Sequence, residues 1–191
     1  SQYWEVLPNF KGENGLTDVA NGTGAAGSSY FVRMGKNSEA GGMTTNALNL
    51  KVDMSGQQGK QLEFSFAVYF FEDETQFGDG IFMSDNGGAS FKRVIALEPQ
   101  RWCNQLWGGF KTFDLDKIMA DNQLKYTSNF IIQFRHEGSG FFSPNSWQDR
   151  DGMYIDEIYI QEAASIIPAK LPFRYCFKDG KPAQHCSFPG T

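Results

Sequence analysis

The chain lacks several features that mark common classes of protein. No apolar run approaches the ~20 residues that a membrane-spanning helix needs, and no basic stripe accompanies the net charge of −5. The two histidines, His136 and His185, lie in no catalytic or zinc-binding motif, and neither a Gly-x-Ser-x-Gly elbow nor a Cys-x-x-Cys pair occurs. We therefore expect no membrane insertion, no nucleic-acid partner and no catalytic centre that a motif defines.

Cysteine is also scarce, with three residues in the chain. Cys176 and Cys186 enclose a Gly/Pro turn segment, so a local disulfide fits their spacing and leaves Cys103 without a partner. This pattern fits a secreted protein, and three free thiols fit a cytosolic one. We favour secretion, because the sequence is strand-rich and poor in lysine. No signal peptide opens the chain, which fits either a mature form or a protein without a leader.

Glycine and phenylalanine are abundant, with 21 and 18 residues, and the apolar runs are short and punctuated by turn residues. Residues 61–71 and 129–138 alternate apolar and polar positions, as half-buried strands do. Residues 80–84 and 90–97 flank an Asp-Asn-Gly-Gly turn. The sequence predicts an all-β fold, an antiparallel two-sheet β-sandwich of the jelly-roll type, with one helical turn at 116–123.

The hairpin turn itself, Ser84–Phe91, resembles the Ser-x-Asp-x-Gly-x-Thr-Trp hairpin of sialidase-type propellers. A propeller repeats its blade at least four times, and this hairpin occurs once. The propeller is therefore excluded, and the hairpin indicates a fold rather than an active site. We assign residues 1–161 to the sandwich domain. Residues 162–191, with four prolines, are expected to form an irregular tail that packs on it or on a neighbour.

The order of several short motifs points to a known architecture. A Phe-rich alternating strand is followed by Asp-Gly and a short apolar run that ends in Ser, then by the sequences FDLD, FIIQFRHEG and DGMYIDEIYI. Over residues 28–161 this order resembles the jelly-roll sandwich of MAM domains and reelin repeats, and of related modules on bacterial secreted enzymes. The disulfide cysteines of MAM domains are absent and the tail has no counterpart. The resemblance therefore favours the architecture over membership of either family.

Asp156 lies in the last predicted strand. Strict alternation places it on one face with Tyr154, Ile158 and Ile160, where an ionised carboxylate needs a partner. The resemblance implies a structural Ca²⁺ held by a carboxylate at this place, with further oxygens from a Gly-punctuated N-terminal loop. The alternative is an aspartate that is solvated or hydrogen-bonded to a turn. The predicted metal ligands are Asp156, Glu13 and Asp18.

A second acidic stretch, FEDETQFGDG at 71–80, carries four carboxylates, of which Asp79 is the last. It lacks the alternating ligand order of an EF-hand loop. We therefore favour a charged, solvated turn over a second cation site.

Two predicted connections, 101–110 and 138–152, are rich in aromatic residues. Connections commonly carry binding residues, and aromatic rings beside amides suit sugar faces and hydroxyls, or equally a protein partner. The remaining alternative is that the tryptophans close the ends of the sandwich as core residues. The predicted ligand-binding residues are Trp102, Trp107, Phe110, Phe142, Trp147 and Gln148.

These observations favour a secreted, non-catalytic binding module with a structural calcium ion and carbohydrate as its first candidate ligand. One alternative is a protein-interaction or adhesion module of the MAM or reelin type, with a protein surface as partner. The other is a small jelly-roll enzyme that cleaves glycans, although no motif singles out a pair of carboxylates for it.

Overall fold

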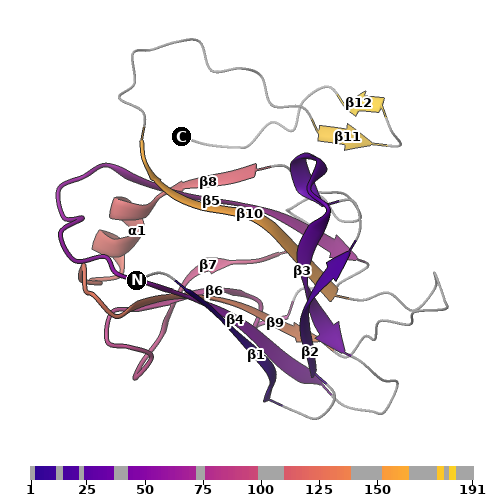
Figure 1. Ribbon diagram of the computed structural model, residues 1–191, viewed down its shortest axis with the longest axis horizontal. Helices are drawn as coiled ribbons and strands as arrows, with labels where there is room; N and C mark the ends of the chain where they lie inside the picture. The colour runs from indigo at the N-terminus through magenta and orange to yellow at the C-terminus, as the bar shows by residue number, and fades with distance from the viewer. Residues whose placement is uncertain are drawn as a thin grey trace.

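The computed structural model describes the residues that form two stacked sheets, one α-helix and a separate short hairpin (Figure 1). For β1, β2 and the short hairpin it describes the backbone alone. The described residues are 3–11, 15–21, 24–36, 43–71, 76–98, 110–138, 152–163, 176–178 and 181–183.

Sheet A is five-stranded with the order β1-β4-β9-β6-β7, and sheet B is five-stranded with the order β2-β3-β10-β5-β8. The strands of sheet A are β1 Tyr3–Lys11, β4 Thr44–Val52, β9 Phe130–Gly138, β6 Gly80–Ser84 and β7 Lys92–Ala96. The strands of sheet B are β2 Gly15–Asn21, β3 Tyr30–Lys36, β10 Gly152–Glu162, β5 Leu62–Phe71 and β8 Phe110–Asp114. The remaining elements are η1 Ala25–Gly27, α1 Leu115–Asp121, β11 Cys176–Lys178 and β12 Lys181–Ala183.

The strand order is that of a jelly roll. Strands β3 to β10 form the two four-stranded sets β3-β10-β5-β8 and β4-β9-β6-β7, in which successive strands repeatedly cross between the sheets. Strands β1 and β2 extend the β4 and β3 edges of these sets. All pairings in both sheets are antiparallel. The predicted all-β, antiparallel two-sheet sandwich is confirmed.

The core lies between the sheets and is rich in phenylalanine. On β5, the alternating side chains of Phe64, Phe66, Val68 and Phe70 are fully buried, as the sequence pattern predicts. Phe134 of β9 meets them from sheet A, with its ring centroid 5.3 Å from that of Phe66 in an edge-to-face contact. Contacts of this geometry stabilise beyond the apolar area that they bury.

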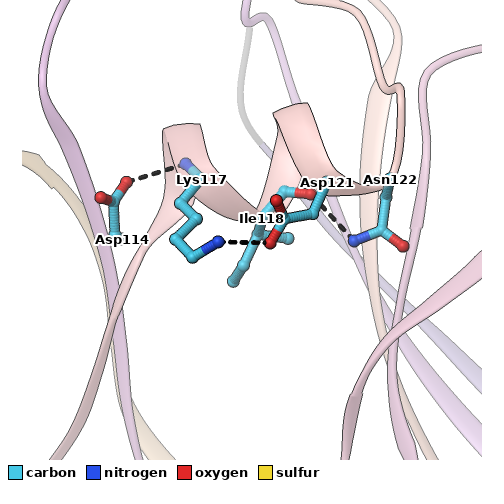
Figure 2. Close-up of polar contacts among 5 residues, drawn as sticks. All are labelled: Asp114, Lys117, Ile118, Asp121 and Asn122. Atoms are coloured by element: carbon cyan, nitrogen blue, oxygen red, sulfur yellow. Dashed lines mark hydrogen bonds and ion pairs between the residues drawn. The ribbon is translucent and has the colours of Figure 1, made fainter. Parts of the chain in front are cut away.

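The short helix α1 begins and ends through side-chain contacts (Figure 2). The Asp114 carboxylate accepts a 2.8 Å hydrogen bond from the Lys117 backbone N–H, which caps the first turn. The Lys117 ammonium lies 2.8 Å from an Asp121 oxygen, one turn further on. At the other end, Asn122 Nδ2 donates to the Ile118 carbonyl at 2.9 Å. Asp114 of the FDLD motif therefore has a structural role in starting this helix.

The predicted tail, 162–191, contains the β11–β12 hairpin, and its packing lies outside the described residues. No helix in the described part of the chain is long and apolar enough to cross a bilayer.

Candidate calcium and ligand-binding sites

Strand β10 contains a β-bulge next to Asp156. Asp156 pairs with Ala67 of β5, and Tyr159 pairs with Ser65, so β10 advances three residues where β5 advances two. Glu157, directly after Asp156, has a φ of 51°, in the left-handed region that non-glycine residues rarely adopt. The extra residue at this point reverses the alternation of side chains along the rest of the strand.

The bulge corrects the predicted surroundings of Asp156. Ile155 belongs to the buried core, and Ile158 and Ile160 pack against that core from beyond the bulge. Asp156 therefore lies on the opposite face, with Tyr154, and the prediction that it shares a face with the two isoleucines is wrong. The cause is the inserted residue, which strict alternation cannot anticipate.

The Asp156 carboxylate connects β10 to the segment between β2 and β3. Its Oδ2 accepts hydrogen bonds from the Ala25 N–H at 2.9 Å and from the Ser28 hydroxyl at 2.6 Å. Its Oδ1 accepts one from the Glu157 N–H at 2.8 Å. These donors satisfy much of the carboxylate, so the alternative of a hydrogen-bonded aspartate accounts for part of the geometry.

Three oxygens nevertheless crowd together here. Ser28 Oγ lies 2.6 Å from Asp156 Oδ2 and 2.7 Å from the Tyr30 carbonyl oxygen. A hydroxyl has one proton and can donate to only one of these two acceptors. Gly24 lies against the same oxygens, since a Cβ there would be 2.2 Å from Ser28 Oγ and 2.4 Å from Asp156 Oδ2. Carboxylate, hydroxyl and carbonyl oxygens are the kinds of ligand that Ca²⁺ takes.

This set is smaller than a complete calcium site, which needs six to eight oxygens. Within the described residues, no group of three His, Cys, Asp or Glu side chains could hold a metal ion. Glu13 lies outside the described residues. Asp18 lies in strand β2 rather than in the expected loop, where it pairs with Arg33 of β3. Because β3 separates β2 from β10, the backbone of Asp18 is two strand spacings, about 10 Å, from β10.

An open depression of about 360 Å³ lies next to Asp156, at the junction of β3 and β10, and three of the residues that line it are aromatic. Its lining includes Tyr30, which is 61% exposed, and Tyr159, which is 47% exposed. On the same face, the ring centroids of Tyr154 and Tyr69 lie 5.5 Å apart with nearly parallel planes. Aromatic residues within strands are typical of a core. The sequence pattern alone therefore does not distinguish these exposed tyrosines from buried aromatic residues.

The two aromatic-rich connections attach at one end of the sandwich. Ala96 of β7 and Arg135 of β9 both pair with Gly80, so these two strands run toward the same end of sheet A. Phe110 of β8 pairs with Ala67, and β10 begins opposite the last residue of β5. Figure 1 shows these strand ends on one side of the molecule. The other predicted ligand-binding residues, Trp102, Trp107, Phe142, Trp147 and Gln148, lie outside the described residues.

The turn Gln76–Asp79 lies at this end and is held by two carboxylates. The Asp79 N–H donates to the Gln76 carbonyl at 3.2 Å, which closes the turn. The Asp79 carboxylate is fully buried and accepts from the Gln76 N–H at 2.9 Å and from the Glu137 N–H at 2.7 Å. Glu137 Oε2 accepts from the Gly78 N–H at 2.9 Å. The expected solvated turn is therefore wrong for Asp79, because its carboxylate replaces water for buried backbone donors.

The outer face of sheet A, turned away from sheet B, carries a row of polar and aromatic residues. Asn49, Gln133, Phe82 and Arg93 lie opposite one another on β4, β9, β6 and β7. Gln133 Nε2 donates to Asn49 Oδ1 at 2.8 Å, and Gln133 Oε1 accepts from Arg135 Nε at 3.0 Å. We call Asn49, Gln133, Phe82, Arg93 and Arg135 the outer row.

The Arg135 guanidinium lies over an aromatic ring, with its Cζ 3.9 Å from the Phe82 centroid. A guanidinium at this distance is attracted to the negative face of the ring. Burial lowers the pKa of Arg135, and the nearby Glu137 carboxylate partly opposes this effect. The guanidinium is therefore a charged, oriented donor, since arginine keeps its proton in proteins.

These features define a jelly-roll β-sandwich domain with an oxygen-rich junction at Asp156 and a polar, aromatic row on one sheet. Comparison with models of known protein families and with curated protein sequences finds no match for this chain.

Proposed function

We propose that this protein is a non-catalytic, extracellular binding module whose ligand is a carbohydrate and whose fold includes a structural calcium ion. The outer row supports the carbohydrate ligand. A sugar ring presents apolar faces and hydroxyl groups, so its binding sites combine aromatic rings with oriented hydrogen-bonding groups. Arg135 over Phe82, fixed by Gln133, supplies this combination on the face of a rigid sheet.

Preorganisation is the property that makes the outer row suited to binding. Asn49 and Gln133 are buried, whereas Phe82 and Arg135 are partly exposed. The buried amides hold the guanidinium before any ligand arrives, so little side-chain entropy is lost on binding. The two aromatic-rich connections start at the end of sheet A next to Arg135, and their tryptophans are proposed to extend this surface.

Calcium is proposed to bind at Asp156, with Ser28 Oγ and the Tyr30 carbonyl as further ligands. A divalent cation would supply positive charge where three oxygens share one hydroxyl proton. Glu13 and Asp18 remain the predicted sources of additional carboxylate ligands. The role is structural, because the ion would tie the segment before β3 to the central strand of sheet B.

Binding to a panel of soluble oligosaccharides and polysaccharides, measured by calorimetry and affinity electrophoresis, tests the carbohydrate ligand. Phe82→Leu, Trp107→Ala and Trp147→Ala are expected to weaken binding. Tyr159→Ala, on the outer face of sheet B, is the matched control and is expected to bind as the parent protein does. A parent protein that binds no glycan but self-associates in sedimentation would instead favour the adhesion module. Release of reducing sugar from any polysaccharide would favour the glycan-cleaving enzyme.

A further inference from the structure

Phe77 is the most exposed large apolar residue in the described part of the chain, with 89% of its surface accessible. Single exposed apolar side chains are ordinary on protein surfaces, but this one lies at the corner of a closed turn. The turn is held by the backbone bond between Asp79 and Gln76 and by the Asp79 and Glu137 carboxylates. The chain therefore presents a phenyl ring to solvent from a fixed backbone.

The fixed turn also depends on the residue after Phe77. A Cβ on Gly78 would lie 2.3 Å from Glu137 Oε2, so a larger residue would displace the carboxylate that accepts the Gly78 N–H. Asp79, the last residue of the turn, is fully buried, and Glu137 belongs to strand β9 of the sandwich and is partly buried. The position of the ring is consequently set by the rigid sheet rather than by the turn alone.

The ring itself is held from one side. The Arg93 guanidinium carbon lies 5.3 Å from the Phe77 centroid, within the range of a cation–π contact. Arg93 Nη2 donates to the Asp79 carbonyl, and the rest of its side chain lies over Gly80. One face of the phenyl ring therefore meets a guanidinium, and the exposure of Phe77 leaves the other face accessible.

The outer row and this ring form one continuous surface. Arg93 pairs with Phe82 across β6 and β7, and Arg135 pairs with Gly80. Two arginine–phenylalanine pairs, Arg135 over Phe82 and Arg93 over Phe77, thus lie on either side of Gly80. The same arrangement of a ring backed by a guanidinium occurs twice along the surface.

We propose that Phe77 is a ligand-stacking residue that forms an additional subsite beside the outer row, where it contacts the apolar face of a pyranose ring. This inference rests on the proposed carbohydrate-binding function and deepens it. The ligand is a chain of sugars rather than a single sugar, because Phe82 and Phe77 belong to separate arginine–phenylalanine pairs and each offers a stacking position.

The test compares Phe77→Ala with Phe77→Tyr, using hexasaccharides and disaccharides of cellulose, xylan, laminarin and mannan as probes in calorimetry. Phe77→Ala is expected to weaken hexasaccharide binding about 10-fold and to leave disaccharide binding unchanged, whereas Phe77→Tyr keeps the parent affinity. Met43→Ala, which removes another exposed apolar side chain before β4, is the control and is expected to have no effect. Melting temperatures should match, because the Phe77 side chain lies outside the core.

The outcomes separate this inference from the proposed function. A parent protein that binds none of the probes overturns both. If Phe77→Ala binds hexasaccharides as tightly as the parent protein, the stacking role alone is overturned. Equal losses for disaccharides and hexasaccharides overturn the additional subsite. Loss of self-association in Phe77→Ala, without any change in glycan binding, would assign the ring to a protein contact instead.

Discussion

Ser28 Oγ lies 2.6 Å from Asp156 Oδ2, although the two residues are 128 positions apart in the chain. The contact joins the segment that leads into β3 to the bulge of β10. Its chemical nature depends on what neutralises the oxygens, because the hydroxyl proton cannot serve both Asp156 and the Tyr30 carbonyl. If a cation lies between these oxygens, the stability of the protein should depend on calcium. If the contact is a simple hydrogen bond, it should not.

Calcium is expected to stabilise the folded protein, and EDTA to destabilise it. An ion that binds the folded state alone contributes about 2.7 kcal/mol at 100 times its Kd, which corresponds to roughly 5–10 °C in Tm for a chain of this size. Asp156→Asn should abolish the response, and Asp53→Asn, at an exposed carboxylate, should retain it. If EDTA has no effect and elemental analysis finds no calcium, the metal site is wrong.

Ser28→Ala separates a metal ligand from a hydrogen-bond donor. If the hydroxyl binds calcium, the substitution should shrink the calcium-induced rise in Tm and should cost less than about 1 kcal/mol in EDTA, where it also relieves the crowded oxygens. Chemical denaturation at several calcium concentrations measures both quantities. A cost that is the same with and without calcium would show that the hydroxyl acts only as a donor.

Glu157 tests the bulge. Its positive φ is tolerated by glycine and asparagine and opposed by β-branched side chains. Glu157→Val is therefore expected to lower the free energy of unfolding by about 1–2 kcal/mol, and Glu157→Asn to be nearly neutral. Urea denaturation measures the difference, with Thr112→Val, at an exposed position of β8 without a positive φ, as a comparison. Equal stability of the valine and asparagine variants would contradict the left-handed backbone at this position.

Asp79→Asn is expected to destabilise the end of the sandwich that carries the turn Gln76–Asp79. The buried carboxylate accepts two backbone N–H bonds, and an amide would turn its NH₂ toward one of those donors. An unsatisfied buried donor costs about 1–3 kcal/mol. Because the turn would lose its anchor, glycan binding through Phe77 should weaken as well. Parent-like stability and binding in this variant would show that the carboxylate is dispensable.

Tyr126 predicts how stability changes at high pH. The pKa of Tyr126 is raised to about 12, mainly by desolvation and to a smaller extent by its hydrogen bond to Asp116. The unfolded value is near 10. Since the folded pKa is the higher one, the protonated phenol favours folding; this contribution is complete below pH ~10 and is lost between pH ~10 and ~12. The parent protein should therefore lose stability more steeply than Tyr126→Phe in this range. Parallel stability curves for the two proteins would contradict the raised pKa.

Much of the sandwich was predictable from alternation, because a strand with one buried face repeats its apolar residues with a period of two. The strand around Phe66 follows this rule, and the strand around Phe134 follows it up to Phe134, after which the polar residue His136 takes the next buried position. The rule fails at Glu157, where a bulge reverses the faces without a glycine or proline to mark it. The rule also misses strand β2, a segment that the sequence predicts as a loop and that pairs with β3 at the edge of sheet B.

The candidate sites were less predictable than the fold. The role of Asp79 depends on a contact with the backbone of Glu137, 58 residues later, which no local pattern contains. Phe77 lies in the acidic stretch 71–80. The only sign in the sequence that it is an exposed binding residue is its place before a glycine in this polar segment. The outer row requires the register of four strands, because β9 contributes two of its residues and β4, β6 and β7 contribute one each.

The strand order has a consequence for how the protein is made. The inner strands β9 and β10 each lie between two earlier strands, and they are the last strands of their sheets to leave the ribosome. Strand β9 joins β4 to β6, and strand β10 joins β3 to β5. Neither pair is connected until residues 130–162 emerge. The phenylalanines of β5 must therefore wait for the second half of the chain. A nascent chain stalled before residue 130 would expose them, and exposed apolar surface of this kind makes incomplete chains prone to aggregation.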